Sequence, residues 1–288
     1  MKAVIAQTEK KKQKRRFITV MMCTTIILLI IPRTYHHGSS EKGFSLIAHR
    51  GDSRSAPENT LPAFRLALQE HVDMVELDSR VTADDVLVII HDATLDRTTD
   101  ARVRWNSHSI QLSQKKYDDI RTLDAGSWFN KRFKGTAVPT LVEAMLEISD
   151  GGRALIHRKT GDPRMYAAEL FRYSLVHKAI VQADDLIFLQ DLHMIAPTIP
   201  LGYVGDSAAI RRIGLMTLKK SGITVLAIDI TGLDRDLLFE AMSDRFTIFI
   251  YTVDKIGLGI QIASFGVDGI ITDNIVHMRA ALRKSGVQ

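Results

Sequence analysis

From residue 44 onward, short apolar or β-branched runs alternate with stretches of helical periodicity. This alternation is typical of repeated β–α units around a parallel sheet. Helical stretches follow the runs, for example at residues 61–70, 164–176, 235–243 and 276–284. Eight runs are predicted to be strands, at residues 44–49, 73–78, 153–159, 180–184, 199–204, 225–230, 247–253 and 268–272.

Eight β–α units in roughly 240 residues match the size of a TIM barrel, an α/β fold in which eight parallel strands close on themselves. An extra apolar run at residues 86–90 is expected to pair outside the main strand order. Residues 93–138 are predicted to form a small insertion after the second strand. A doubly wound sheet is the competing architecture, but no Gly-rich dinucleotide loop follows the first predicted strand.

The N-terminus differs from the rest of the chain in composition. An uncharged apolar run covers residues 17–31 and ends at Pro32. A basic flank before an apolar core is typical of a signal peptide or a signal-anchor. At about 1.5 Å per residue, the run spans only about 22 Å, short of the about 30 Å core of a bilayer. The basic flank consists of Lys2, Lys10, Lys11, Lys12, Lys14, Arg15 and Arg16.

We interpret residues 1–16 as a basic cytoplasmic tail, 17–32 as a transmembrane signal-anchor or signal peptide, 33–43 as a linker and 44–288 as the globular domain. No small-x-small cleavage site precedes Ser39, which favours an uncleaved single-pass anchor. The positive-inside rule then predicts a globular domain on the extracytoplasmic side of the membrane. Secretion after signal cleavage is the alternative.

Charge and cysteine content limit the possible functions of the globular part. Residues 1–33 hold eight of the 38 Lys and Arg residues and one of the 33 Asp and Glu residues, so 30 basic and 32 acidic residues remain. The net charge of +5 is therefore an orientation signal of the N-terminus and does not indicate nucleic-acid binding. Cys23 is the only cysteine and lies in the apolar run, so the globular part has no disulfide and no thiol nucleophile.

Polar residues at the ends of the predicted strands are the candidates for chemistry, because the active site of a parallel barrel lies at the carboxyl ends of its strands. Glu76 and Asp78 are two residues apart at the end of the second strand, so their side chains are on the same side of it. Two carboxylates in a barrel mouth require a cation, and a hard divalent metal such as Mg²⁺ or Ca²⁺ would supply it. The alternative is that the two residues simply end the strand at the solvent surface.

Two histidines, His49 and His91, also follow apolar runs and suit acid and base catalysis near neutral pH. Arg50 and Lys159 would supply positive charge for an anionic substrate. Together, a metal, two cations and two histidines favour phosphoryl chemistry over glycoside or acyl chemistry.

A set of short motifs occurs in a defined order over residues 44–286. No single motif is specific, but their order along the chain is. The motifs are Ala-His-Arg-Gly at 48–51, Ala-Pro-Glu-Asn-Thr at 56–60, Val-Glu-Leu-Asp at 75–78, His-Asp at 91–92, Leu-Asp-Arg-Thr-Thr at 95–99, Asp-Ala-Gly-Ser-Trp-Phe at 124–129, Val-Pro-Thr-Leu at 138–141, Val-Gln at 181–182, Tyr-Thr-Val-Asp at 251–254 and Gly-Val-Asp-Gly-Ile-Ile-Thr-Asp at 266–273. This ordered set resembles the glycerophosphodiester phosphodiesterase family.

The resemblance implies a TIM barrel that uses a divalent metal to hydrolyse a glycerophosphodiester, or a lipid head group of that type, to glycerol 3-phosphate and an alcohol. It implies an acid–base pair, His49 and His91. Phosphate or substrate contacts would come from Arg50, Lys159, Gln182 and Tyr251, and metal ligands from Glu76 and Asp78, with Glu58 as a further candidate.

Three positions depart from the family pattern. His157 stands where the family usually has a metal-ligating Glu two residues before the Lys. An imidazole ligand would favour Mn²⁺ or Zn²⁺ over Ca²⁺, whereas the alternative is that His157 packs beside a two-carboxylate site. Tyr251 replaces a common Trp, and Ala183 replaces a common Ser.

Two further functions fit the same residues. The first is a phospholipase D type of reaction on lysophospholipids. The second is a weakly active or non-catalytic phosphodiester-binding protein, which the missing third carboxylate suggests. In each case the N-terminal segment is expected to bring the protein to a membrane.

Overall fold

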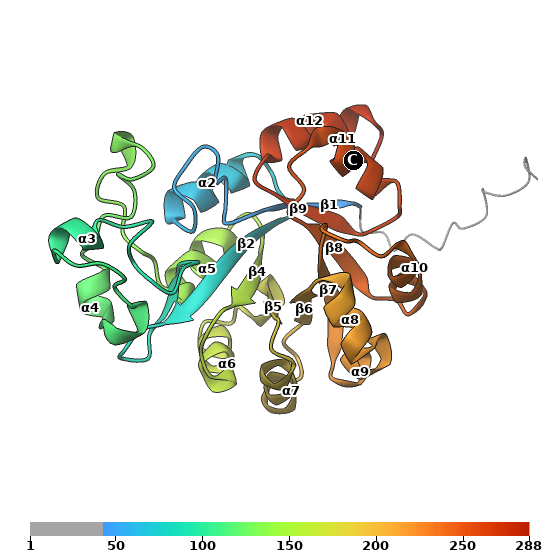
Figure 1. Cartoon of the computed structure of the whole chain (residues 1–288), viewed down its shortest axis with the longest axis horizontal. Coiled ribbons are helices and arrows are strands. Elements are labelled where there is room, and N and C mark those ends of the chain that lie inside the picture. The colour runs from blue at the N-terminus through green and yellow to red at the C-terminus, as the bar shows by residue number, and fades with distance from the viewer. Residues whose placement is uncertain (1–42, 288) are drawn as a thin grey trace, which may run out of the picture. The chain divides into compact units, whose positions relative to one another are not determined.

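Eight parallel strands close into a barrel in the computed structural model, which describes residues 43–287 (Figure 1). The barrel closes where the first strand pairs with both the second and the last. All eight predicted strands are confirmed, with ends shifted by up to a few residues. They are β1 (Ser45–Ala48), β2 (Met74–Val81), β4 (Arg153–Arg158), β5 (Ala179–Ala183), β6 (Leu201–Gly205), β7 (Ile223–Asp229), β8 (Thr247–Tyr251) and β9 (Gly269–Thr272).

Side chains on the strands alternate between the barrel interior and the surrounding helices. On β2, Val75 and Leu77 pack in the outer core against the helices, while Met74 belongs to the interior core. Glu76 and Asp78 follow Met74 at two-residue steps, so they also face the interior, above an apolar floor. That floor consists of Ile47, Met74, Leu155, Ile180, Val204, Val225, Ala227, Phe249 and Ile271.

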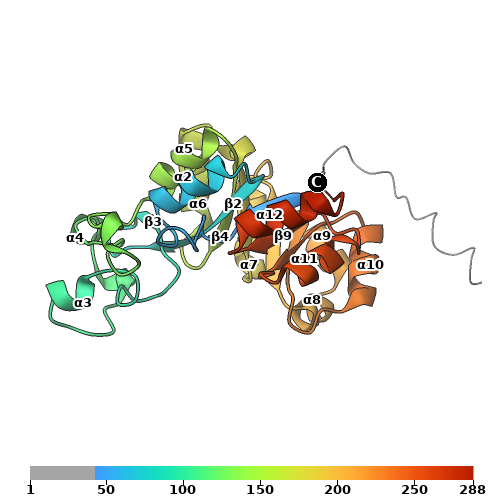
Figure 2. The same ribbon diagram turned by 90° about the horizontal axis from the view of Figure 1, so that it is seen from above.

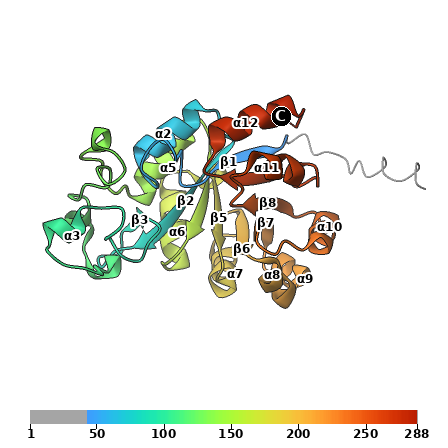
Figure 3. The ribbon, with the colours of Figure 1, turned by 45° about the horizontal axis from the view of Figure 1, so that its top comes forward.

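Helices surround the strands as an outer ring (Figure 3). Several of them begin at a side chain that accepts a hydrogen bond from a free N–H of the first turn, as Asp162, Asp185, Asp206 and Asp234 do. The helices are α2 (Leu61–Gln69), α5 (Leu141–Ser149), α6 (Pro163–Arg172), α7 (Leu186–Ile195), α8 (Ser207–Ile213), α9 (Leu215–Lys220), α10 (Arg235–Ser243), α11 (Ile256–Ala263) and α12 (Ile275–Lys284), with a 3₁₀ turn, η3 (Val176–Lys178), before β5.

The extra apolar run forms β3 (Leu87–Ile89), which lies outside the barrel order, as predicted. It pairs antiparallel with the end of β2. Residues 93–138 then form short elements beside the barrel, with α3 and α4 beyond β3 in Figure 2. They have a core of their own that includes Leu95, Ile110, Leu112 and Ile120. The elements are α3 (Ala101–Arg104), η1 (Leu112–Gln114), α4 (Tyr117–Ile120) and η2 (Lys131–Phe133).

The predicted tail at 1–16, the apolar segment at 17–32 and the linker up to residue 42 lie outside the described residues. Within residues 43–287, no helix has both the length and the apolar character needed to cross a bilayer.

Candidate active site

The chain turns sharply after β1, and this turn places the first group of polar residues. Arg50 and Gly51 both have left-handed backbone conformations, with φ of 57° and 83°. A Cβ at Gly51 would lie only 2.7 Å from the carbonyl carbon of Ala63 in α2, so this position requires glycine. The turn directs the backbone N–H of Arg50 at Glu76, and it donates to Oε2 over 3.1 Å.

Glu76 and Asp78 are both buried, and their surroundings differ. Burial, and then repulsion from Asp78, raise the pKa of Glu76 to about 7. Burial would also raise the pKa of Asp78, but the positive charges of Arg50 and Lys159 outweigh it and lower the pKa to about 2. Arg50 Nε lies 3.0 Å and Lys159 Nζ 3.3 Å from the carboxylate of Asp78, and Asn59 Nδ2 donates to it over 2.9 Å.

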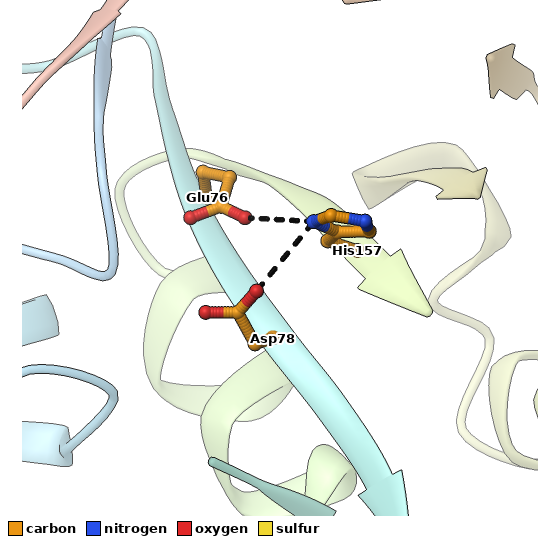
Figure 4. A group of neighbouring side chains, drawn as sticks. All are labelled: Glu76, Asp78 and His157. Atoms are coloured by element: carbon orange, nitrogen blue, oxygen red, sulfur yellow. Dashed lines mark ion pairs between the residues drawn. The ribbon is translucent and has the colours of Figure 1, made fainter. Parts of the chain in front are cut away.

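His157 points from β4 toward these two carboxylates (Figure 4). Its Nδ1 lies 3.5 Å from Asp78 Oδ1 and 3.9 Å from Glu76 Oε1. Burial and the charge of Lys159 lower the pKa of His157 to about 3, so its ring is neutral near pH 7 and has a lone pair to offer. Ligand atoms of the three residues lie within 4.8 Å of one another. This set of two carboxylates and one imidazole fits a divalent metal ion.

His49, at the end of β1, is held by a carboxylate from the opposite end of the chain. Its Nδ1 lies 2.7 Å from Asp273 Oδ1, which also accepts from Ser53 Oγ over 2.9 Å. Burial raises the pKa of Asp273, but the hydrogen bond with His49, the charge of His49 and the hydrogen bond from Ser53 together outweigh it and lower the pKa. An ionised carboxylate only accepts, so Nδ1 carries the proton and Nε2 is left for other partners. Burial lowers the pKa of His49, but the hydrogen bond with Asp273 and the charge of Glu76 outweigh it and raise the pKa above 6.5.

His91 follows β3 and has a similar partner. Its Nδ1 lies 2.8 Å from Asp92 Oδ1. The pKa of Asp92 is lowered, mainly by hydrogen bonds from Arg97, so Nδ1 of His91 is again the protonated nitrogen. Arg80 Nε donates to the His91 carbonyl oxygen over 2.7 Å and fixes the backbone at this point.

Glu58, the further metal-ligand candidate from the sequence, pairs with two guanidinium groups in this structure. Its Oε1 accepts from Arg50 NH1 over 2.9 Å, and Arg97 donates to both of its oxygens over 2.8 Å. With both oxygens bound by guanidinium groups, Glu58 acts as their counter-ion. The pKa of Glu58 is lowered because the hydrogen bond from Arg97 and the charge of Arg50 outweigh burial.

Comparison with known proteins identifies the same family that the sequence motifs resemble. Residues 49–277 match the model of the glycerophosphoryl diester phosphodiesterase family. The chain belongs to this family. A glycerophosphodiester phosphodiesterase of Caldanaerobacter subterraneus is 29% identical over 249 residues, covering 84% of this chain and 98% of the relative.

Solved structures of similar proteins have the same fold. A glycerophosphodiester phosphodiesterase from Agrobacterium tumefaciens has a TM-score of 0.71 and 30% identity, covering 82% of this chain and 99% of its own. A phosphodiesterase from Oleispira antarctica, solved with the product sn-glycerol-3-phosphate, has a TM-score of 0.73 and 25% identity, covering 84% and 97%. This member of the family is a phosphoric diester hydrolase.

The two remaining candidate residues of this phosphodiesterase lie on other strands. Gln182 is buried on β5 beside His157, and its Oε1 has no hydrogen-bond partner within the described part of the chain. Tyr251 ends β8, paired in register with Asp229. Burial, and then the charge of Asp229, raise the pKa of the Tyr251 hydroxyl. The structure therefore brings His49, Arg50, Glu76, Asp78, His157 and Lys159 into contact or near contact, with Gln182 beside them and Tyr251 farther round the barrel.

Sequence reasoning missed three residues of this phosphodiesterase site: Asp273, Asn59 and Arg97. All three lie within motifs that carry the family resemblance. The signal that could have found Asp273 is its place directly after β9, because β9 neighbours β1 in a closed barrel. For Asn59 and Arg97 the motif position was the only signal, since their contacts depend on loop conformation.

Proposed function

We propose that this phosphodiesterase hydrolyses glycerophosphodiesters to glycerol 3-phosphate and an alcohol, with His49 and His91 as the acid–base pair. One observation carries the proposal. Each of these histidines is held at Nδ1 by an ionised carboxylate. In the turn after β1, the backbone N–H of Arg50 donates to Glu76, and Arg50 Nε lies 3.0 Å from Asp78. This arrangement provides two proton-transfer groups around a cationic site for phosphate.

The chain's own residues have distinct roles in this proposal. The guanidinium of Arg50 and the ammonium of Lys159 bind phosphoryl oxygens, and Asn59 keeps Asp78 in place through two hydrogen bonds. The raised pKa of His49 suits it to hold the proton that the leaving alkoxide receives. His91, whose Nδ1–H is bound to Asp92, would use Nε2 to accept a proton from the attacking nucleophile. That nucleophile is either water or the substrate's own glycerol hydroxyl, which would form a cyclic phosphate that water then opens.

The metal would be held by Glu76, Asp78 and His157. When bound, a divalent cation neutralises charge that develops on the phosphoryl oxygens. The two carboxylates suit Mg²⁺ or Ca²⁺, and the imidazole makes Mn²⁺ or Zn²⁺ alternatives. The direction of the His157 ring favours ligation over simple packing.

The purified protein should release glycerol 3-phosphate from glycerophosphocholine when a divalent metal is added. Substituting His49→Ala or His91→Ala should lower kcat by about 10²- to 10⁴-fold, the usual size of a general acid or base effect. Absence of metal-dependent turnover on every glycerophosphodiester tested would contradict the proposal. Full activity in either alanine variant would contradict the assigned acid–base pair.

We also propose that residues 17–32 anchor the enzyme in a membrane with the barrel on the extracytoplasmic side. The support is the basic flank followed by an uncharged apolar run. Cell fractionation of the full chain and of a variant without residues 1–32 tests this proposal. The full chain should sediment with membranes and be accessible to protease from outside the cytoplasm. Equal distribution of the two proteins would contradict anchoring.

A further inference from the structure

One guanidinium group, that of Arg97, binds two carboxylates at the same time. Its Nε and NH2 donate to the two oxygens of Asp92 over 2.7 and 3.0 Å. Its NH1 and NH2 donate to the two oxygens of Glu58, each over 2.8 Å. Both carboxylates are therefore gripped by two hydrogen bonds, an arrangement that the planar fork of arginine allows and the point charge of lysine does not.

Each of the two carboxylates also orients a different residue of the proposed active site. Asp92 Oδ1 binds His91 Nδ1 over 2.8 Å, and Glu58 Oε1 binds Arg50 NH1 over 2.9 Å. The result is one continuous chain of hydrogen bonds that runs from His91 through Asp92, Arg97 and Glu58 to Arg50. A shift of the Arg97 side chain would disturb both ends of this chain.

Arg97 is supplied by the segment at residues 93–138 and not by a barrel strand. Its backbone is fixed there by its neighbours: Leu95 is fully buried in the second core, and Asp96 accepts from the N–H groups of Ser109 and Ile110 over 2.6 and 2.9 Å. The segment is thus tied to the barrel mouth through the Arg97 side chain, and also through Arg132, whose NH2 donates to the Ser55 carbonyl oxygen over 2.6 Å. This tie gives the segment a physical role in the arrangement of the site.

The hydrogen bonds of Arg97 with Asp92 and Glu58 contribute more to the position of the site residues than to the stability of the fold. The Arg97 side chain is 43% exposed, and ion pairs at such positions contribute little to the free energy of unfolding. Catalytic rates respond far more strongly to position, since a displacement of about 1 Å can lower a rate by about 10²-fold. Loss of the fork should therefore affect turnover without unfolding the protein.

We propose that Arg97 is a positioning residue, which holds the side chain of the phosphate-binding Arg50 in place through Glu58 and that of the acid–base His91 through Asp92. In this way the segment at 93–138 contributes to catalysis. This inference rests on the proposed function, because it takes His91 and Arg50 as working residues of the site. Arg97 itself need not touch the substrate.

The test is Arg97→Lys, which keeps the charge and removes the fork. Its matched control is Arg65→Lys, because Arg65 on α2 also grips a carboxylate, Glu147, with two hydrogen bonds of 2.9 and 2.7 Å, and neither residue contacts the site residues described above. We expect Arg97→Lys to lower kcat and raise KM, with a combined loss in kcat/KM of about 10- to 100-fold. Arg65→Lys should match the wild type in kcat/KM, and both variants should unfold at nearly the same temperature as the wild type.

Two readouts separate positioning from a general structural role. Affinity for the product glycerol 3-phosphate, measured by calorimetry, should fall in Arg97→Lys because the fork no longer fixes Glu58, the partner of Arg50 NH1. Activity of Arg97→Ala should rise on addition of guanidinium chloride at millimolar concentration, and not with an equal concentration of sodium chloride.

Turnover by the wild type distinguishes failure of the positioning role from failure of the proposed function. If the wild type turns over glycerophosphodiesters and Arg97→Lys behaves like Arg65→Lys in kcat/KM and in product affinity, the positioning role alone is overturned. If Arg97→Lys loses activity only in proportion to a lower unfolding temperature, the residue is structural and the inference is also overturned. If the wild type has no such turnover, the inference falls together with the proposed function.

Discussion

His49 donates its Nδ1 proton to Asp273 over 2.7 Å, although 224 residues separate them in the chain. The pairing follows from barrel closure, because β1 and β9 are neighbours and each residue comes directly after its strand. Asp273 is itself fixed, since its N–H donates to Asp254 over 2.9 Å and Ser53 donates to its carboxylate. The His49 ring is therefore oriented by a support that is tied to two further loops.

Replacing Asp273 with Asn should impair catalysis by loosening this support. We expect kcat to fall at least about 10- to 100-fold, the size found when a carboxylate that orients a metal-ligating histidine is removed. The pKa of His49 should also fall, because its main stabilising partner is neutralised. The alkaline limb of the kcat profile would then move to lower pH, which a pH series of initial rates measures. Ser53→Ala, which removes only one hydrogen bond to Asp273, should give a smaller shift in the same direction.

The same pair should contribute to stability in a defined pH window. The pKa of Asp273 is lowered from 3.8, so its contribution is present above that pH and is lost as pH falls through the lowered value. The pKa of His49 is raised from 6.5, so its contribution is present below that pH and is lost as pH rises through the raised value. Urea unfolding of wild type and Asp273→Asn should differ most between pH 3.8 and 6.5 and differ less at pH 9. An equal difference at every pH would contradict this assignment.

Replacing His157 with Glu should change which metal the site prefers. A third carboxylate adds a negative charge and a hard oxygen ligand, so affinity for Ca²⁺ should rise relative to Mn²⁺. We expect a change in the ratio of the two dissociation constants of about tenfold or more, equivalent to about 1.4 kcal/mol. Calorimetric titration with each metal measures the ratio without reference to activity. His157→Ala is the control, and it should weaken binding of both metals; an unchanged ratio in the Glu variant would mean that His157 does not ligate.

Gly51→Ala tests the turn that presents Arg50. The left-handed backbone costs a non-glycine residue about 1–2 kcal/mol, and the contact at 2.7 Å with Ala63 adds about 1–3 kcal/mol. Gly135→Ala is a matched control, because Gly135 has the same φ of 83° and no atom within 4 Å of its added Cβ. Thermal unfolding should show a clearly larger loss for Gly51→Ala. Equal losses would mean that Ala63 moves aside at no cost.

Much of the barrel was predictable because its signals are local. The period-two pattern of Met74, Glu76 and Asp78 places all three on one face of β2, whatever the rest of the chain does. The antiparallel β3 was also predictable, since it lies within a few residues of its partner strand. The strand-end rule then directs attention to His49, Arg50, Glu76 and Asp78.

Other features of the site depended on barrel closure, strand register and loop conformation, which bring distant side chains together. The amino-acid sequence by itself determined the eight strands, the order of the motifs and the polar residues at the strand ends, because each of these depends on neighbours in the chain. Only the tertiary structure decided that Asp273 holds His49, that Glu58 pairs with Arg50 and Arg97, and that His157 turns toward the two carboxylates. These contacts depend on the register between strands and on which charged groups compete for the same partners. No short stretch of residues determines either of them.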